Sequence, residues 1–144
     1  MIVLDSFAVL AFLKGEPAAD LVEGMLSDPD GCTLSVLGVS EVVDHLVRLA
    51  GVDEEEAVLD LVEMGLLAPA PLDADGGLRA GRLRAARYHR TTCAVSLADC
   101  VAADLARALD GSLATADPHL LDLCEMEGIS WIALADSTGT TWAP

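Results

Sequence analysis

Short apolar runs alternate with helical patterns along this sequence. The runs comprise residues 2–4, 32–35, 112–115 and 129–134. Between them, apolar residues recur at helical spacing, as they do at Val39, Val42, Val43, Leu46, Val47 and Ala50. This alternation is typical of an α/β fold in which helices connect parallel strands. We therefore expect a mainly parallel central sheet flanked by helices.

Turn-forming residues and caps divide the helical part of the chain. We expect helices over residues 6–13, 18–26, 39–50, 53–65, 77–90, 96–109 and 118–127, and an extended or loop segment over 68–75. The chain has 144 residues, no internal repeat and no linker-like composition. Residues 1–144 are therefore predicted to form a single domain.

The charge balance restricts the partners of this chain. Its 24 acidic and 8 basic residues give a formal net charge of −16. Because affinity for nucleic acid comes largely from Lys and Arg, the chain as a whole is a poor non-specific nucleic-acid binder. A polyanionic substrate would have to be held by a local basic patch or by metal ions.

The cysteines and the first residues bear on the compartment. Cys32, Cys93, Cys100 and Cys124 are widely spread, without the tight spacing of a zinc or redox site. We expect buried thiols in a reducing cytoplasm. The apolar start lacks the positive region of a signal peptide, and no apolar run approaches the roughly 18 residues of a membrane span. We therefore expect a cytoplasmic protein with no membrane partner.

Two acidic residues follow apolar runs. Asp5 comes directly after residues 2–4, and Asp117 comes shortly after residues 112–115. In open parallel sheets, sites lie outside the carboxyl ends of the strands, and both residues are predicted to lie there. Each also has a structural explanation, because Asp5 can cap the next helix and Asp117-Pro118 is a typical helix start.

Two further acids occur near predicted helix starts. Glu41 is expected in the first turn of its helix, where the helix dipole favours a negative charge. Asp99 follows Ser96 at the spacing of a capping box. The helix of Asp99 is apolar nearly all round, so we expect it to be buried and its acid to point into the centre of the molecule.

Taken together, Asp5, Glu41, Asp99 and Asp117 are predicted to gather at one edge of the sheet. Mg²⁺ and Mn²⁺ prefer oxygen ligands, and a cation would keep several neighbouring carboxylates ionised. Such a metal could polarise a phosphoryl oxygen and activate a water molecule. The hydroxyls of Ser6 and Thr115 beside these acids could orient a metal-bound water or merely cap helices.

Five arginines form a basic cluster near the middle of the chain: Arg79, Arg82, Arg84, Arg87 and Arg90, joined by His89. In an acidic chain this cluster is a local patch suited to RNA phosphates or to an acidic partner. The alternative is a partly exposed helix whose arginines pair with surplus acids.

Four blocks of this sequence, in the same order, resemble blocks of PIN-domain proteins, especially the VapC-type toxins of bacterial toxin–antitoxin pairs. They are Ile-Val-Leu-Asp-Ser-Phe-Ala-Val-Leu-Ala-Phe-Leu-Lys-Gly-Glu-Pro at 2–17, Ser-Glu-Val-Val at 40–43, Ser-Leu-Ala-Asp-Cys-Val-Ala-Ala at 96–103 and Leu-Ala-Thr-Ala-Asp-Pro at 113–118. The similarity covers nearly the whole chain. Residues 70–95 match no block of the family.

The resemblance implies a metal-dependent endoribonuclease, using Mg²⁺ or Mn²⁺, with a catalytic and metal-binding quartet of Asp5, Glu41, Asp99 and Asp117. Its expected partners are an RNA substrate, a second copy of the chain in a homodimer, and a VapB-type antitoxin that inserts a basic side chain among the acids. Substrate contacts are predicted for Ser6, Thr115, Arg84 and Arg87. The alternative is a catalytically inactive PIN-like module that binds RNA or a protein partner without cleavage.

Overall fold

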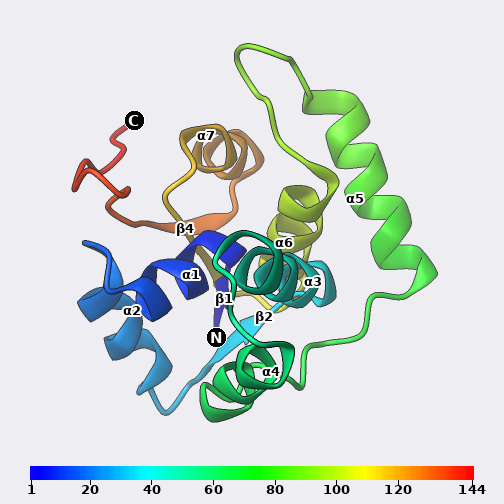
Figure 1. The fold of residues 1–144 in the computed structure, drawn as a ribbon. Helices are drawn as coiled ribbons and strands as arrows, with labels where there is room; N and C mark the ends of the chain where they lie inside the picture. Colours follow the sequence, from blue (N-terminus) through cyan, green and yellow to red (C-terminus); the bar gives the residue numbers. More distant parts are fainter.

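A four-stranded parallel sheet forms the centre of the protein (Figure 1). The computed structural model describes all residues, 1–144. The strands are β1 (Ile2–Leu4), β2 (Cys32–Leu34), β3 (Ser112–Thr115) and β4 (Ser130–Ala133), in the order β2-β1-β3-β4. Every adjacent pair is parallel, which confirms the predicted α/β class. Because β1 and β3 are neighbours, the residues that follow them lie at the same edge of the sheet.

Seven α-helices connect and cover the strands. They are α1 (Ser6–Lys14), α2 (Ala19–Leu26), α3 (Val36–Asp44), α4 (Glu54–Glu63), α5 (Ala74–Arg87), α6 (Leu97–Ala108) and α7 (Pro118–Glu127). A π-helical turn, η1 (His45–Leu49), continues directly from α3. The bounds of α1, α2, α4, α6 and α7 agree with the sequence prediction to within two residues.

The two faces of the sheet bury separate apolar cores. Val3 of β1 packs with residues of α5, α6 and α7, whereas the next residue, Leu4, packs with residues of α1 to α4. The neighbouring strand repeats this alternation at Leu113 and Ala114. Successive residues of a strand point to opposite faces, so adjacent apolar residues of one short strand serve both cores. The result is a three-layered arrangement of helices, sheet and helices.

Two helices begin earlier than the sequence patterns predict. Helix α3 begins at Val36, because Ser35, which directly follows β2, caps the helix by accepting a hydrogen bond from Gly38 N at 3.0 Å. Helix α5 begins at Ala74, inside the segment predicted to be a loop, because Asp73 accepts a hydrogen bond from Gly76 N at 2.8 Å. In both cases the cap acts several residues before the periodic pattern becomes visible.

Helix α5 also ends earlier than predicted, at Arg87 instead of Arg90. Residues 89–93 form a tight turn in which His89 and Cys93 exchange two backbone hydrogen bonds of 3.0 and 2.9 Å. These bonds satisfy backbone groups that a further helical turn would otherwise have used.

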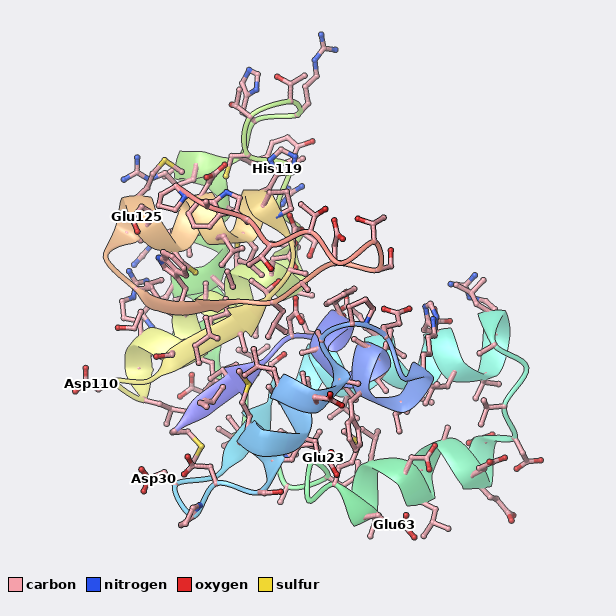
Figure 2. The ribbon with its side chains drawn as sticks, turned by 90° about the vertical axis from the view of Figure 1, so that its left-hand side faces the viewer. Glu23, Asp30, Glu63, Asp110, His119 and Glu125 are labelled. Carbon is pink, nitrogen blue, oxygen red and sulfur yellow. The ribbon has the colours of Figure 1, made fainter.

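The burial of the thiols agrees with expectation. All four cysteines are free, and Cys93, Cys100 and Cys124 are buried. Acidic side chains are spread over the exterior, with Asp30, Glu63 and Asp110 at the periphery of the molecule in Figure 2. None of the helices combines the length and the apolar character that crossing a membrane requires.

We expect Gly111→Ala to lower the free energy of unfolding by about 1 to 3 kcal/mol. A Cβ atom at Gly111 would overlap the carbonyl oxygen of Met1, which accepts a hydrogen bond from Ser112 N where β1 and β3 meet. Urea denaturation measures the change. The control is Gly24→Ala within α2, where a Cβ meets no atom within 4 Å. That variant should be as stable as the wild type or gain up to about 1 kcal/mol. Equal stability of the two variants would contradict the close approach at Gly111.

Candidate active site

The ends of β1 and β3 bring two carboxylates together. Asp5 follows β1 and caps α1, accepting a hydrogen bond from Ala8 N on Oδ1 at 2.8 Å. Asp117 lies two residues beyond β3 and caps α7, accepting from His119 N on Oδ1 at 2.8 Å. The capping roles considered from the sequence are therefore real. They direct both side chains to the carboxyl edge of the sheet.

Thr115, the last residue of β3, joins these two acids. Its side chain is fully buried. The hydroxyl donates a hydrogen bond to Asp5 Oδ2 and accepts one from Asp117 N at 3.0 Å. Thr115 was predicted to contact substrate, but in the structure its hydroxyl is occupied in positioning two carboxylates.

Asp99 completes a group of three acids. It lies in the first turn of α6 and forms the predicted capping box, with 2.7 Å from Ser96 N to Asp99 Oδ2 and 3.0 Å from Asp99 N to Ser96 Oγ. Asp99 is only partly buried, so the prediction that it points into the centre of the molecule was wrong. It lines a surface hollow of about 320 Å³ together with Asp5, Ser6, Phe7, Ala116, Asp117, Asp136 and Ser137. We call this site the acidic hollow.

The proximity of the acids affects their ionisation. The pKa of Asp5 is raised to about 7. Burial is the largest cause, and the charges of Asp99 and Asp117 also raise the pKa, whereas the hydrogen bonds from Thr115 and Ala8 N lower it. Burial also raises the pKa of Asp99, with a further contribution from Asp117. The carboxyl groups therefore disfavour one another's ionised forms, and a bound cation would relieve this repulsion.

The donors in the acidic hollow fit a hard divalent cation. Asp99 Oδ1 and Asp117 Oδ2 take part in no hydrogen bond, and each carboxylate retains unused lone pairs. As the side chains stand, no three acidic, histidine or cysteine residues are arranged to ligate one ion. Mg²⁺ is commonly held by one or two carboxylates, with water completing its coordination. This open arrangement of carboxylates fits that mode of binding.

Glu41 does not line the acidic hollow. Because α3 begins at Val36, Glu41 lies in the second helical turn and not in the first turn as predicted. Its side chain is exposed. Helix α3 nevertheless packs against α1, which Asp5 caps, and against α6, whose first turn carries Asp99. The participation of Glu41 in the site stays a prediction.

The two arginines predicted to contact substrate occupy different surroundings. Arg84 donates a hydrogen bond from Nε to Val95 O at 2.9 Å, and its guanidinium lies 4.2 Å from the centre of the Tyr88 ring. The charge of Arg84 partly offsets the rise in the pKa of Asp99, but Arg84 does not line the acidic hollow. Arg87 instead donates from Nε to Glu127 Oε1 at 2.6 Å.

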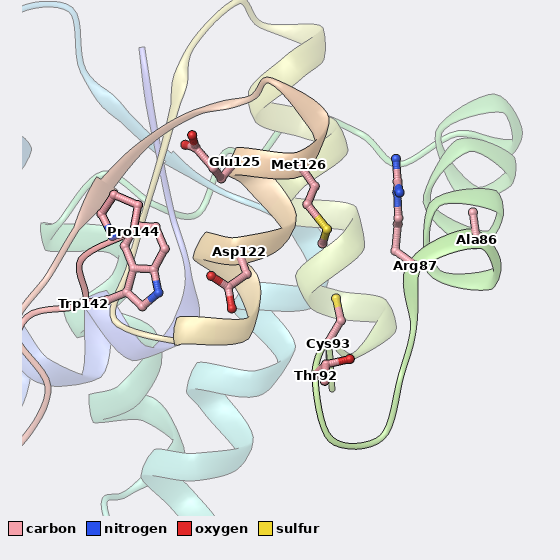
Figure 3. Close-up of a pocket in the computed structure, with 9 residues that line it drawn as sticks. All are labelled: Ala86, Arg87, Thr92, Cys93, Asp122, Glu125, Met126, Trp142 and Pro144. Carbon is pink, nitrogen blue, oxygen red and sulfur yellow. The ribbon is translucent and has the colours of Figure 1, made fainter.

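Arg87 also lines a larger hollow of about 510 Å³, with Asp122, Met126, Trp142 and other residues, and this hollow shares no residue with the acidic one (Figure 3). Arg87 is therefore not a residue of the acidic hollow. Ser6, in contrast, lines the acidic hollow as predicted.

Sequence reasoning missed Asp136, a fourth acid in the acidic hollow. Asp136 follows β4 by three residues. Its Oδ1 accepts hydrogen bonds from the Thr138 hydroxyl at 2.6 Å and from the backbone N of Thr138 and Thr140 at 2.9 and 3.0 Å. These bonds hold the pKa of Asp136 below its ordinary value. The strand-end rule that selected Asp5 and Asp117 would have selected Asp136 as well.

The chain is similar to known proteins in sequence pattern and in fold. Residues 2–126 match the family model described as "PIN domain". The fold is similar to that of FitAcB from Neisseria gonorrhoeae, with a TM-score of 0.67, 19% identity and coverage of 92% of this chain and 96% of that chain.

Two further crystal structures show the same fold. VapBC2 from Rickettsia felis, solved with a promoter DNA fragment, has a TM-score of 0.63 at 16% identity, covering 92% of this chain and 98% of that chain. VapBC-1 from nontypeable Haemophilus influenzae has a TM-score of 0.64 at 15% identity, covering 92% and 97%. No curated protein matches the sequence significantly.

In the absence of divalent cations, we expect Asp5 to make the stability of the protein depend on pH. The pKa of Asp5 is about 7 in the folded chain and about 4 in an unfolded chain. The stabilisation that its proton supplies is therefore complete below about pH 4 and is lost as the pH rises through about 7. The unfolding free energy of the wild type, relative to Asp5→Asn, should fall by roughly 2 to 4 kcal/mol between about pH 4 and about pH 8. Urea denaturation in EDTA measures this difference, and a value independent of pH would contradict the raised pKa.

Proposed function

The chain belongs to the PIN-domain family, and we propose that it is a metal-dependent endoribonuclease that acts in the cytoplasm as the toxin of a toxin–antitoxin pair. The observation that carries this proposal is the convergence of Asp5, Asp99 and Asp117 in the acidic hollow. These residues are far apart along the chain, and each is anchored by a backbone hydrogen bond.

Mg²⁺ or Mn²⁺ bound in the hollow would neutralise the scissile phosphate and activate water for hydrolysis of the phosphodiester bond. Asp5, Asp99 and Asp117 would hold the ion, and Glu41 is proposed as a fourth acid contributed by α3. Thr115 keeps Asp5 and Asp117 in register through its hydroxyl. Because these carboxylates are already oriented, little reorganisation is needed when the ion and the phosphate bind.

A protein partner is supported by an exposed apolar surface. The side chains of Val47 and Leu49 on η1 and of Val58, Leu59 and Val62 on α4 are exposed, and these two elements pack against each other. Exposed apolar patches of this kind mark interaction sites. We propose a homodimer that also binds a VapB-type antitoxin. The antitoxin partner is supported by the fold that this chain shares with the structures named FitAcB and VapBC.

A catalytically inactive module that binds RNA or a protein partner is the second candidate. Two observations favour it: no three side chains are arranged to ligate one ion, and Glu41 lies outside the acidic hollow. Both candidates use the same surface, so only a cleavage measurement separates them.

We expect the purified chain, free of antitoxin, to cleave RNA in the presence of Mg²⁺ or Mn²⁺ and to be inactive in EDTA. Asp5→Asn, Asp99→Asn and Asp117→Asn should each reduce the cleavage rate about a hundredfold or more, because each removes a negative charge beside the ion. Glu41→Gln should reduce it as well if α3 supplies the fourth acid. Gel analysis of a labelled RNA measures the rates.

The matched control is Glu23→Gln, which removes an exposed acid on α2 outside the acidic hollow. This variant should cleave at the wild-type rate. Absence of cleavage by the wild type with either metal would favour the inactive module. Full activity of Glu41→Gln alone would restrict the site to the three converging aspartates.

We also expect divalent cations to raise the melting temperature. At about 100 times its dissociation constant, a ligand stabilises the folded state by about 2.7 kcal/mol, which corresponds to several degrees for a domain of this size. Asp5→Asn should lose most of this shift, whereas Glu23→Gln should retain it. Differential scanning fluorimetry with increasing Mn²⁺ measures the effect, and an unchanged wild-type melting temperature would argue against a metal site.

A further inference from the structure

A second charged hollow lies between α5, α6 and α7. It has a volume of about 360 Å³ and is lined by Arg79, Arg82, Leu83, Ala86, Arg87, Arg107 and Glu127. We call it the arginine hollow. It contains four of the eight basic residues of the chain and shares no lining residue with the acidic hollow.

Two carboxylates fix three of these arginines. Asp104, whose side chain is only 6% exposed, accepts hydrogen bonds from Arg79 Nε at 3.0 and 3.1 Å and from Arg107 Nη2 at 3.2 Å. Glu127 accepts from Arg87 Nε at 2.6 Å, and its other oxygen lies 3.6 Å from Arg107 Nη1. Arg107 therefore bridges the two acids, with Arg79 and Arg87 held on either side.

This network leaves much of its hydrogen-bonding capacity unused. Arg79 and Arg87 are bound through Nε only, so their terminal Nη groups remain available. Arg82 takes part in no hydrogen bond and no ion pair. Four guanidinium groups face two carboxylates, so the hollow carries an excess of two positive charges on a chain of net charge −16. Pairing with surplus acids therefore does not account for the whole cluster.

We propose that the arginine hollow binds backbone phosphates of an RNA strand and is an anchoring site separate from the acidic hollow. That the polyanion is RNA rests on the proposed function. Guanidinium groups pair with phosphate oxygens in a bidentate manner, and arginines already held by carboxylates lose less side-chain freedom on binding. In a strongly acidic protein, a local positive surface is also where a polyanion is attracted.

The lining of the hollow favours RNA over an acidic protein partner. Its apolar lining is limited to Leu83 and Ala86, whereas protein interfaces centre on buried aromatic and aliphatic anchors. The exposed apolar side chains of η1 and α4 supply such anchors elsewhere on the molecule.

Binding of an end-labelled single-stranded RNA, measured by fluorescence anisotropy at several salt concentrations, tests the proposal. All proteins carry Asp5→Asn and are kept in EDTA, so that binding is measured without cleavage. Adding Arg82→Gln should weaken binding roughly three- to tenfold and reduce the slope of log K against log salt by about 0.7 to 1. Adding Arg87→Gln as well should reduce affinity and slope further.

Arg48→Gln is the matched control, because Arg48 is an exposed arginine on η1, paired with Asp44 and outside the arginine hollow. It should leave the slope unchanged. Because Arg82 has no partner in the fold, Arg82→Gln should melt at the same temperature as its parent.

Unchanged affinity and slope in the double arginine variant would overturn the proposal, as would a parent protein that binds no RNA. Retained RNA binding with loss of antitoxin binding would assign the hollow to the protein partner and would also overturn it. The binding measurement does not depend on catalysis. A wild type that fails to cleave RNA therefore contradicts the proposed nuclease, whereas it leaves an anchoring site with the expected salt dependence standing.

Discussion

The hydroxyl of Thr115 makes the contact on which the candidate site depends. It donates to the carboxylate of Asp5 and accepts from the backbone N of Asp117, so it joins the ends of two neighbouring strands at the level of their functional side chains. Burial makes these bonds costly to lose, because an unsatisfied hydroxyl or carboxylate away from water is unfavourable. The parallel pairing of β1 and β3 brings the strand ends together, and Thr115 converts that proximity into a defined arrangement of acids.

The same carboxylates perform structural and chemical roles. Asp5 and Asp117 each cap a helix, and Asp99 completes the capping box of α6 with Ser96, so all three satisfy backbone N–H groups at helix starts. A cap also fixes the side chain of the capping residue, so these helix starts orient carboxylates at the edge of the sheet without further supporting residues. Structural and functional explanations of an acid at such a position are therefore compatible.

Much of the fold could be predicted from the sequence, because short runs such as residues 2–4 and 112–115 alternate with helical patterns, as the strands of an α/β fold do. Asp5 and Asp117 follow these two runs. The start of α3 could not be read from periodicity, since Ser35 caps the helix directly after β2, before the apolar spacing of the helix becomes visible. That error placed Glu41 in the wrong helical turn. Asp136 was missed because the strand-end rule was applied only to the runs 2–4 and 112–115, although Asp136 follows the run 129–134 as closely as Asp117 follows 112–115. The sequence also could not show which partners the individual arginines of α5 bind. Arg84 and Arg87 are three residues apart, yet one is bound to Val95 O and the other to Glu127 on α7.

The distribution of charge changes what the net charge of −16 means for binding. Asp104 is the more deeply buried of the two acids of α6. It stabilises the packing of α5 on α6 by holding Arg79, and it also binds Arg107 of its own helix. Without these cations, a buried carboxylate would be strongly unfavourable. The acids therefore do more than repel a polyanion. Asp104 and Glu127 keep three guanidinium groups oriented at the surface. The mutual repulsion of Asp5, Asp99 and Asp117 favours the binding of a cation in the acidic hollow. In such a chain, local arrangement decides whether a phosphate is attracted, because exposed charges farther away than the screening length of about 10 Å contribute little at ordinary ionic strength.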